Sequence, residues 1–514
     1  MALLSADRPS LPDLLDTYGI EMLWQPSLSV ESTRPYDALL EDIIDGRQQL
    51  DILCVEGSII TAPEGTGMFD QLRRRAKKDW LLALAEKARY VVAMGTCAAF
   101  GGVHSAPPNP SDCVGLQMDK EMPGGLLPVE WRSGAGFPVI NIAGCPAHPN
   151  TMTKTLAMIA SGIILQLDHL NRPKEFFSTL VHQGCTRNEY HEYDVEESEF
   201  GTNGCMFFNL GCKGPFTQAT CNTELWNGRS SKTRAGVPCF GCTSPGFPED
   251  EAFSRQKNSA RYRSNCRSVS SAPTTLPIKI LPSRCAGAGE KTEDGALMAR
   301  KTLNIDLNRV EGDLEFELDV EDGRVVDARC IGVMYRGFEQ IMIGRTPRDA
   351  AVITPRVCGI CGTAHLYAAT LALEQIWQVE VPPNAARIRN LCLLAESIQN
   401  DIRQSFLMFL VDFCHSAYRS HPLFEEIMAA FEPFKGRHHL GALEQSRDAV
   451  GIVALFGGQW PHSSYMLPGG VVGKPSQRKL IDALDIISRL QRWYEHAVIG
   501  EDLETWLAED SFDA

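Results

Sequence analysis

Six cysteines and two histidines, His182 and His191, fall between residues 182 and 242, in a segment where the apolar periodicity of helices and strands fades. The segment is rich in Gly, Asn and Thr, so it has little apolar surface to bury. A stretch of this composition is expected to fold around inorganic groups rather than around an apolar core. The candidate ligands are His182, Cys185, Cys205, Cys212, Cys221, Cys239 and Cys242.

The whole chain carries 17 cysteines in 514 residues and a formal net charge of −15. Asp7 and Arg8 interrupt the apolar opening, so the start does not resemble an export signal, and a cytoplasmic, reducing location is expected. Thiols there are metal ligands or buried apolar groups more often than disulfides. The acidic balance argues against a nucleic-acid partner. Membrane insertion is not expected, because the longest nearly uncharged apolar stretch, 156–167, falls short of the roughly 20 residues that span a bilayer.

The first 165 residues alternate short apolar runs with a charged amphipathic stretch that predicts a helix over 69–87. The runs that predict strands are 51–55, 90–94 and 137–143. This alternation indicates a parallel sheet. Cys97 and Cys145 each follow a predicted strand, so we expect both in the crevice where such sheets bind ligands. Two thiolates are only half of a four-ligand set.

Residues 253–297 are polar and basic, without helix or strand periodicity, and are interpreted as a linker or disordered segment. Cys266 and Cys285 lie there without a partner motif. From Met298 onward the pattern is ordered again, with a strand pair predicted over 303–323 and helices after Cys361. The second half is therefore predicted to be mainly α with a small β entrance.

The spacing of the thiols leaves two kinds of metal site open. A structural zinc site normally uses two Cys-x-x-Cys pairs, whereas residues 182–242 hold only the pair Cys239 and Cys242. Irregular spacing favours iron–sulfur clusters; one zinc site among buried thiols remains the alternative. The pair Cys358 and Cys361, preceded by Arg356, is a half-site for a soft metal, although a lone Cys-x-x-Cys also fits a redox dithiol or half a zinc site.

These residues also carry a resemblance to the [NiFe]-hydrogenases. Residues 19–248 resemble the small, electron-transferring subunit, through Val55-Glu-Gly-Ser, Gly95-Thr-Cys-Ala, Gly144-Cys-Pro, His182-Gln-Gly-Cys, Gly211-Cys-Lys-Gly-Pro and Pro238-Cys-Phe-Gly-Cys. Residues 298–500 resemble the amino-terminal part of the large subunit, through Arg309-Val-Glu-Gly, Tyr335-Arg-Gly-Phe-Glu, Gly344-Arg-Thr-Pro-Arg-Asp-Ala, Arg356-Val-Cys-Gly-Ile-Cys, Pro383-Asn-Ala-Ala-Arg-Ile-Arg-Asn, Pro461-His and Pro468-Gly-Gly-Val. So many motifs in one order are specific to the family.

The resemblance implies four parts and a set of site residues. The parts are a flavodoxin-like α/β domain over 1–165, an irregular Fe–S cluster-binding domain over 166–252, a linker or out-of-frame segment over 253–297, and the amino-terminal part of a large subunit over 298–514. The family assigns His182, Cys185, Cys205 and Cys212 to a distal [4Fe-4S] cluster, and Cys221, Cys239 and Cys242 to a medial cluster that is often [3Fe-4S]. It assigns Cys97 and Cys145 to half of a proximal [4Fe-4S] cluster, Cys358 and Cys361 to half of a nickel–iron centre, Glu311 to a proton relay and Glu339 to a magnesium ion.

The chain departs from the family pattern at several places. No cysteine precedes Cys54 and none follows Cys414, although the family carries a further Cys-x-x-Cys at each of those ends. Asp313 stands where many members have His. The two subunits, normally separate, are joined. A truncated or frame-damaged fusion is expected, with an evolved fusion as the alternative, and this chain alone is expected to be inactive as an enzyme.

The subtype follows from finer features. Ile360 stands where catalytic members commonly have Val, and Phe406 and Phe409 are expected to add bulk to a gas channel. These residues favour a cytoplasmic hydrogen sensor that cleaves H2 and signals to a histidine-kinase partner, thereby controlling hydrogenase genes. The alternatives are a cytoplasmic uptake hydrogenase that passes electrons to an acceptor protein, and an inactive chain that only binds clusters.

Overall fold

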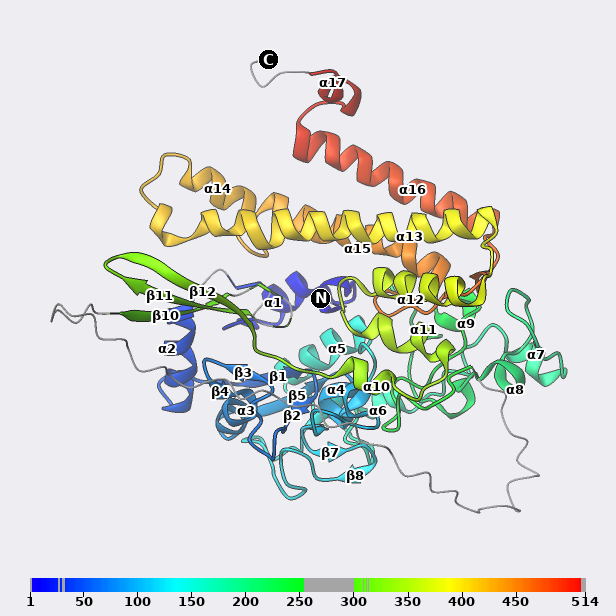
Figure 1. The fold of residues 1–514 in the computed structure, drawn as a ribbon, viewed down its shortest axis with the longest axis horizontal. Helices are drawn as coiled ribbons and strands as arrows, with labels where there is room; N and C mark the ends of the chain where they lie inside the picture. The colour runs from blue at the N-terminus through cyan, green and yellow to red at the C-terminus, as the bar shows by residue number, and fades with distance from the viewer. Residues whose placement is uncertain are drawn as a thin grey trace, which may run out of the picture.

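The structure is a computed structural model that describes residues 2–25, 28–29, 33–253, 300–307, 309–310, 312 and 314–509. The expected linker, apart from Phe253, lies outside the described residues, and so do Cys266, Cys285, Glu311 and Asp313. Figure 1 shows the first half below, the long helices of the second half above, and a β-sheet projecting to one side.

A parallel three-stranded sheet forms the centre of the first half. Its strands are β1 (Ile52–Glu56), β5 (Tyr90–Met94) and β9 (Ile140–Ile142), in the order β1-β5-β9. The middle strand is apolar throughout, and Val91, Val92 and Ala93 are fully buried, as expected for a strand covered on both faces. The predicted α/β class is confirmed. The helices and smaller strands of this half are α1 (Leu11–Thr17), α2 (Thr33–Ile44), α3 (Lys77–Ala85), α4 (Thr96–Phe100), α5 (Pro149–Ala160), β2 (Ile59–Ile60), β6 (Cys113–Val114), β7 (Met118–Asp119) and β8 (Met122–Pro123).

The helix predicted over 69–87 is wrong in its first half. Residues 71–76 form a hairpin of β3 (Gln71–Leu72) and β4 (Arg75–Ala76), and only α3 is helical. The hairpin leans on the second half of the chain: Gln71 N donates to Val333 O at 3.1 Å, and Asp70 pairs with Met334. Long-range pairing therefore overrides the local helical pattern.

Residues 166–253 contain only short helices joined by loops, as their composition predicted. The helices are α6 (Lys174–Phe177), α7 (Asn188–Glu192), α8 (Phe207–Leu210) and α9 (Lys232–Ala235). The small apolar cluster of this region includes two thiols, Cys212 and Cys239. Thiols thus occupy places that aliphatic side chains hold in an ordinary core.

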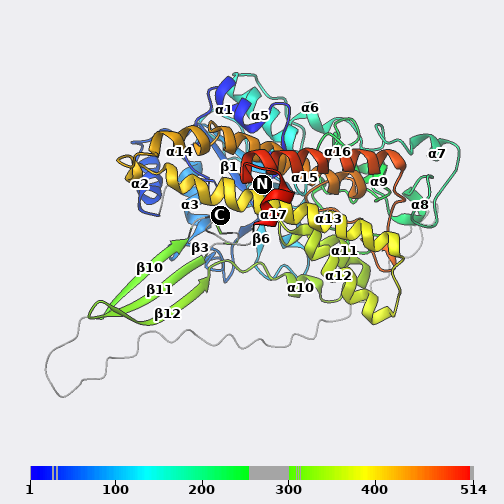
Figure 2. The same cartoon turned by 90° about the horizontal axis from the view of Figure 1, so that it is seen from above.

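The second half begins with an antiparallel sheet of β10 (Lys301–Leu307), β11 (Leu314–Glu321) and β12 (Arg324–Gly332). Two strands were predicted and three are present. The helical part centres on α15 (Arg437–Gly457), which packs against both α13 (Pro383–Ile402) and α16 (Gln477–Tyr494) (Figure 2). The predicted mainly α class with a small β entrance is confirmed. The remaining elements are α10 (Phe338–Met342), α11 (Ala350–Ile353), α12 (Gly362–Trp377), α14 (Phe424–Phe431), β13 (Met466–Leu467), β14 (Gly470–Val471) and α17 (Leu503–Ala508).

The two halves share one apolar core. Residues of the first half such as Leu14 and Phe240 belong to the same buried cluster as Ile353 and Trp460 of the second. Polar contacts also cross between the halves, for example from Ser111 Oγ to Tyr335 O at 3.1 Å. No helix among the described residues is both long and apolar enough to cross a bilayer.

Candidate metal centres

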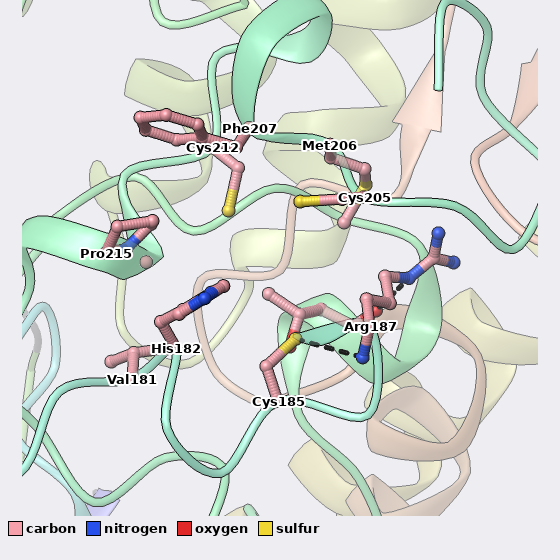
Figure 3. Close-up of a pocket in the computed structure, with 11 residues that line it drawn as sticks. Val181, His182, Cys185, Arg187, Cys205, Met206, Phe207, Cys212 and Pro215 are labelled. Carbon is pink, nitrogen blue, oxygen red and sulfur yellow. Dashed lines mark hydrogen bonds between the residues drawn. The ribbon is translucent and has the colours of Figure 1, made fainter. Parts of the chain in front are cut away.

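One pocket gathers all four residues expected at the distal site. His182, Cys185, Cys205 and Cys212 line one small, partly open hollow. Figure 3 shows the thiols of Cys205 and Cys212 facing one another, with the His182 ring and the Cys185 sulfur reaching in from the other side. These residues come from loops around α7 and α8, so the pocket forms only when separate turns pack together.

The surroundings of the distal pocket favour the protonated form of two of its thiols, Cys205 and Cys212. Burial raises the pKa of Cys205 to about 11 and moves that of Cys212 upward as well. Arg187 borders the pocket; its backbone N donates to Cys185 Sγ at 3.4 Å and its guanidinium donates to Gly204 O at 2.7 Å. A soft cation would remove the cost of ionising these thiols.

His191 is a residue of this site that the sequence did not single out. Its ring packs edge-on against His182, with 5.2 Å between centroids, and its Nδ1 lies 2.9 Å from Glu196 Oε1. One donor atom each from His191, Glu196 and Cys205 lies within 4.8 Å of the others. The spacing of His191 along the chain gave no signal, because its relation to Cys205 depends on how the loop folds back.

The three thiols expected at the medial site also lie together. Cys221 is half-buried, and its desolvation, followed by repulsion from Cys242 and Cys239, raises its pKa to about 12. Burial and Cys242 likewise raise the pKa of Cys239. The backbone N of Cys239 donates to Cys212 Sγ at 3.3 Å, so one turn of chain contacts both thiol sets.

Cys97 and Cys145 meet at the carboxyl end of the sheet, in the predicted crevice. The Cys97 thiol has its pKa lowered to about 7, chiefly by a hydrogen bond with Cys145 and against the effect of burial; the pKa of Cys145 moves upward because the pair shares one proton. Gly102 is required beside them, since a Cβ there would lie 2.7 Å from Cys97 Sγ.

Thr96 joins these two loops to the medial thiols. Its Oγ1 donates to Cys242 O at 2.5 Å and accepts from Gly144 N at 2.8 Å. The residue is 1% exposed, so both bonds are shielded from water. The sequence gave no sign of this role, because it depends on contact between segments about 50 and 150 residues apart.

Cys358 and Cys361 lie at the start of α12, in direct contact. The backbone N of Cys361 donates to Cys358 Sγ at 3.4 Å, and the neighbouring thiol together with burial raises the pKa of Cys361. Glu396, on α13, accepts from Thr363 N and Ala364 N at 3.1 Å each and so caps α12 beside the thiols. Its pKa is raised by burial.

His462 lies between the thiols of the two halves. Its Nδ1 is 3.6 Å from Cys145 Sγ, and a Cβ on Gly359, between Cys358 and Cys361, would be 4.0 Å from its Nε2. Burial and the nearby Arg356 guanidinium lower its pKa to about 3, so the ring is neutral at pH 7. The imidazole therefore connects the Cys97–Cys145 pair with the Cys358–Cys361 pair.

Other expected residues are not gathered in this way. Glu339 is exposed in the first turn of α10, and no group of three His, Cys, Asp or Glu donors forms around it within the described ranges. Phe406 packs against Phe431 and Trp493, while Phe409 is 58% exposed. The packing of these two rings gives the expected narrowing of a gas channel no support.

Three family models match the chain. The model of the "NADH ubiquinone oxidoreductase, 20 Kd subunit" matches residues 1–159, the C-terminal model of the "NiFe/NiFeSe hydrogenase small subunit" matches 177–254, and "Nickel-dependent hydrogenase" matches 336–418. The F420 non-reducing hydrogenase II small subunit of Methanosarcina mazei is 33% identical over 274 residues, which are 48% of this chain and 69% of that protein. The chain belongs to the [NiFe]-hydrogenase family. Its first half matches the small subunit and its second half the large subunit, as the sequence motifs indicated.

The match to the large subunit covers a smaller share of that subunit's length. The periplasmic [NiFeSe] hydrogenase large subunit of Desulfomicrobium baculatum is 34% identical over 206 residues, which are 37% of this chain and 40% of that protein. The solved actinobacterial-type NiFe-hydrogenase from Ralstonia eutropha H16 aligns with 48% of this chain and 75% of its own, at 32% identity and a TM-score of 0.43. By the two curated relatives, the chain spans 69% of a small subunit and 40% of a large one.

The residues present fit iron–sulfur clusters better than a single structural zinc. Seven donors divide into a four-donor hollow and a neighbouring three-thiol group, and six of them are soft thiols. Irons of a cluster can accept ligands from several loops, as here. The Cys358–Cys361 pair fits half of a soft-metal site, because it offers two thiols in contact at the end of a helix.

Proposed function

We propose that the chain is the electron-transferring part, together with the first portion of the catalytic part, of a hydrogenase that cleaves H2 heterolytically. One observation carries this proposal: His462 links the Cys145 thiol to the Cys358–Cys361 turn, while Thr96 links the same loops to Cys242. Electron transfer needs neighbouring cofactors to lie close together. These contacts support a series of thiol sets that runs from the Cys358–Cys361 pair to the distal hollow.

Each thiol set has its own cofactor in this proposal. His182, Cys185, Cys205 and Cys212 hold a distal [4Fe-4S] cluster, and Cys221, Cys239 and Cys242 hold a medial cluster of [3Fe-4S] or [4Fe-4S] type. Cys97 and Cys145 supply two ligands of a proximal cluster, and Cys358 and Cys361 supply two ligands of a nickel–iron centre, which when complete provides the Lewis acid that polarises H2. Glu311 relays the proton, and Glu339 is a candidate magnesium ligand.

The chain's own residues prepare these sites. Cys145, Cys205, Cys212, Cys239 and Cys242 are buried, so water is limited at these thiols and electrostatic interactions there are strengthened. Glu396 fixes the first turn of α12 and with it the Cys361 backbone. The neutral His462 ring keeps a polar contact to Cys145 without adding a charge between the two thiol pairs.

Within this activity we propose hydrogen sensing in the cytoplasm, with a histidine kinase as signalling partner. The support is Ile360, which adds a methylene between the two half-site thiols where Val is common. The second candidate is a hydrogen-oxidising enzyme that delivers electrons to an acceptor protein. Phe409 favours this candidate, because its ring is exposed and adds no bulk to a buried gas channel.

Metal analysis tests the cluster assignment. Protein purified without oxygen is expected to be brown and to contain about seven or eight iron atoms per chain, since residues 182–242 can hold one cluster of four irons and one of three or four. Iron and zinc are measured by mass spectrometry alongside the visible spectrum. One zinc per chain with negligible iron would contradict the proposal.

Sensing and uptake are separated by turnover in the completed enzyme. A sensor is expected to oxidise H2 at least tenfold more slowly than its Ile360→Val variant and to bind a histidine kinase only under H2. An uptake enzyme is expected to gain less than twofold from Ile360→Val and to show no H2-dependent kinase binding.

A further inference from the structure

Lys232 is a buried lysine in the medial thiol region that the family assignment leaves without a role. It is the first residue of α9 and only 8% exposed. Its backbone is fixed from two sides. Thr233 Oγ1 donates to Asn222 Oδ1 at 3.0 Å, next to Cys221, and the end of α15 packs so closely that a Cβ on Gly458 would lie 2.6 Å from Lys232 Cα.

The charged end of Lys232 lies over the ring of Phe240, in the turn between Cys239 and Cys242. Its principal favourable electrostatic partners are Cys242, Cys239 and Cys221, and its Nζ lies 5.4 Å from the centroid of the Phe240 ring. Among the described residues no carboxylate oxygen lies within ion-pair distance of Nζ. Burial, with some repulsion from Arg356, lowers the pKa of the ammonium, and the three thiols oppose that shift.

A buried ammonium is costly unless an anion compensates it. Protonated thiols carry no charge and cannot do so. Thiolates can, and these three become thiolates when they ligate a metal cluster, because a metal ligand must be deprotonated. The charge of the buried Lys232 is therefore compensated when a cluster is bound to the three thiolates. Without a metal the same charge is uncompensated and unfavourable.

We propose that Lys232 is the charge partner of the cluster held by Cys221, Cys239 and Cys242, and that its ammonium makes this cluster easier to reduce. The inference rests on the proposed function, since it requires a cluster at these thiols. On reduction the cluster gains one electron, from H2 in function or from dithionite in a titration, and no bond forms or breaks. The ammonium keeps its proton and stabilises the added negative charge, as net charge near a cluster is known to do.

The test is a potentiometric titration of the full chain followed by electron paramagnetic resonance. Lys232→Met keeps the length of the stem and removes the charge; Lys232→Arg keeps the charge. Lys435→Met, at an exposed lysine paired with Glu432, is the control for loss of one positive charge elsewhere. The medial signal is identified as the one that Cys239→Ser removes.

At a fixed potential, Lys232→Met is expected to lower the reduced-to-oxidised ratio of the medial cluster at least tenfold, a shift of about 59 mV for one electron. Lys232→Arg and Lys435→Met are expected to stay within threefold of the parent, with iron content and signal type unchanged in all variants. A ratio within threefold in Lys232→Met overturns the proposal. So does loss of medial iron in Lys232→Met but not in Lys232→Arg, because Lys232 would then hold the cluster rather than tune it.

The same samples separate this inference from the proposed function. If the parent chain shows no medial signal and no iron, the cluster assignment itself fails. If the parent signal is present and the Lys232 variants do not move it, only the role of Lys232 fails.

Discussion

Single thiols in this chain are distinguished by their neighbours rather than by their own chemistry. Cys205 and Cys239 are both buried and both have a raised pKa, yet Cys205 lines the distal hollow and Cys239 lies with Cys221 and Cys242. The Cys239 backbone still touches the distal set through its bond to Cys212. Any partition of ligands between two clusters therefore has to be tested residue by residue.

Replacing one thiol in each set is expected to damage one cluster only. Cys205→Ser should remove the distal signal and leave the medial one, and Cys239→Ser should do the reverse, because a serine oxygen is a poor ligand for iron in a thiolate site. The Cys239 backbone N–H survives the substitution, so its bond to Cys212 persists. Electron paramagnetic resonance and iron counts provide the measurement, with Cys330→Ser, at an exposed thiol of β12, as control. Loss of the same signal in both variants would show that the partition is wrong.

The sequence predicted which thiols lie together much better than it predicted their surroundings. Cysteines and glycines at fixed spacings mark the ligand loops, because a turn that presents a thiol needs particular residues close by. Thr96, His462 and Lys232 act through contacts with segments far along the chain, and no local pattern marks such contacts. Glu339 illustrates the opposite case, since its motif is present while the described structure leaves its side chain exposed and without companion ligands.

At the scale of helices and strands, local sequence patterns predicted an element correctly where its residues pack against neighbours in the same sheet. The apolar runs that became β1 and β5 pack within their own sheet, and their predicted bounds were nearly right. The β3–β4 hairpin was missed because the start of β3 and the preceding Asp70 bond to residues some 260 positions away, Val333 and Met334. β12 was missed because its residues are largely exposed and lack a buried alternating face.

The start of α12 depends on a carboxylate from another helix. Glu396 receives two backbone N–H groups of α12 and the Trp460 indole N–H at 3.0 Å, all in a buried setting. Glu396→Ala is expected to destabilise this junction by about 1–3 kcal/mol, because three donors lose their acceptor. Glu396→Gln keeps one acceptor oxygen and should cost less than half as much.

Hydrogen exchange of the α12 amides measures this effect, with Glu380→Ala at an exposed site as control. Protection of Thr363 and Ala364 should fall in Glu396→Ala and change little in the control. Unchanged protection in Glu396→Ala would show that the packing of α12, and not the carboxylate, holds the first turn.

At the scale of the whole molecule, the two halves form one body around a shared core, and the half-site lies where they meet. The outward faces of α13 and α16, on either side of α15, expose apolar residues such as Leu394, Ile481 and Leu484. A monomer seldom leaves so many large apolar side chains open to water unless something packs on them. The second half therefore offers an apolar surface on which a further segment or subunit could pack.

Activity of the 514-residue chain by itself is expected to be absent. Cys358 and Cys361 provide two thiolates, and a metal held by two thiolates keeps open, exchangeable positions. Loss of outer-sphere partners alone typically costs about 10–100-fold in affinity or activity, so loss of half the direct ligands should cost more. Cys97 and Cys145 likewise supply only two ligands of the proximal cluster, which is the first electron acceptor in the proposed path. We expect no H2-dependent dye reduction and no stoichiometric nickel in the chain as given.

Supplying one further Cys-x-x-Cys ahead of residue 1 and another beyond residue 514 is expected to restore nickel binding and slow turnover, and Cys361→Ser in that extended protein should abolish both. Measurable H2 oxidation by the chain without these additions would mean that other residues complete the site, with Cys392, Cys414 and His365 the first to substitute.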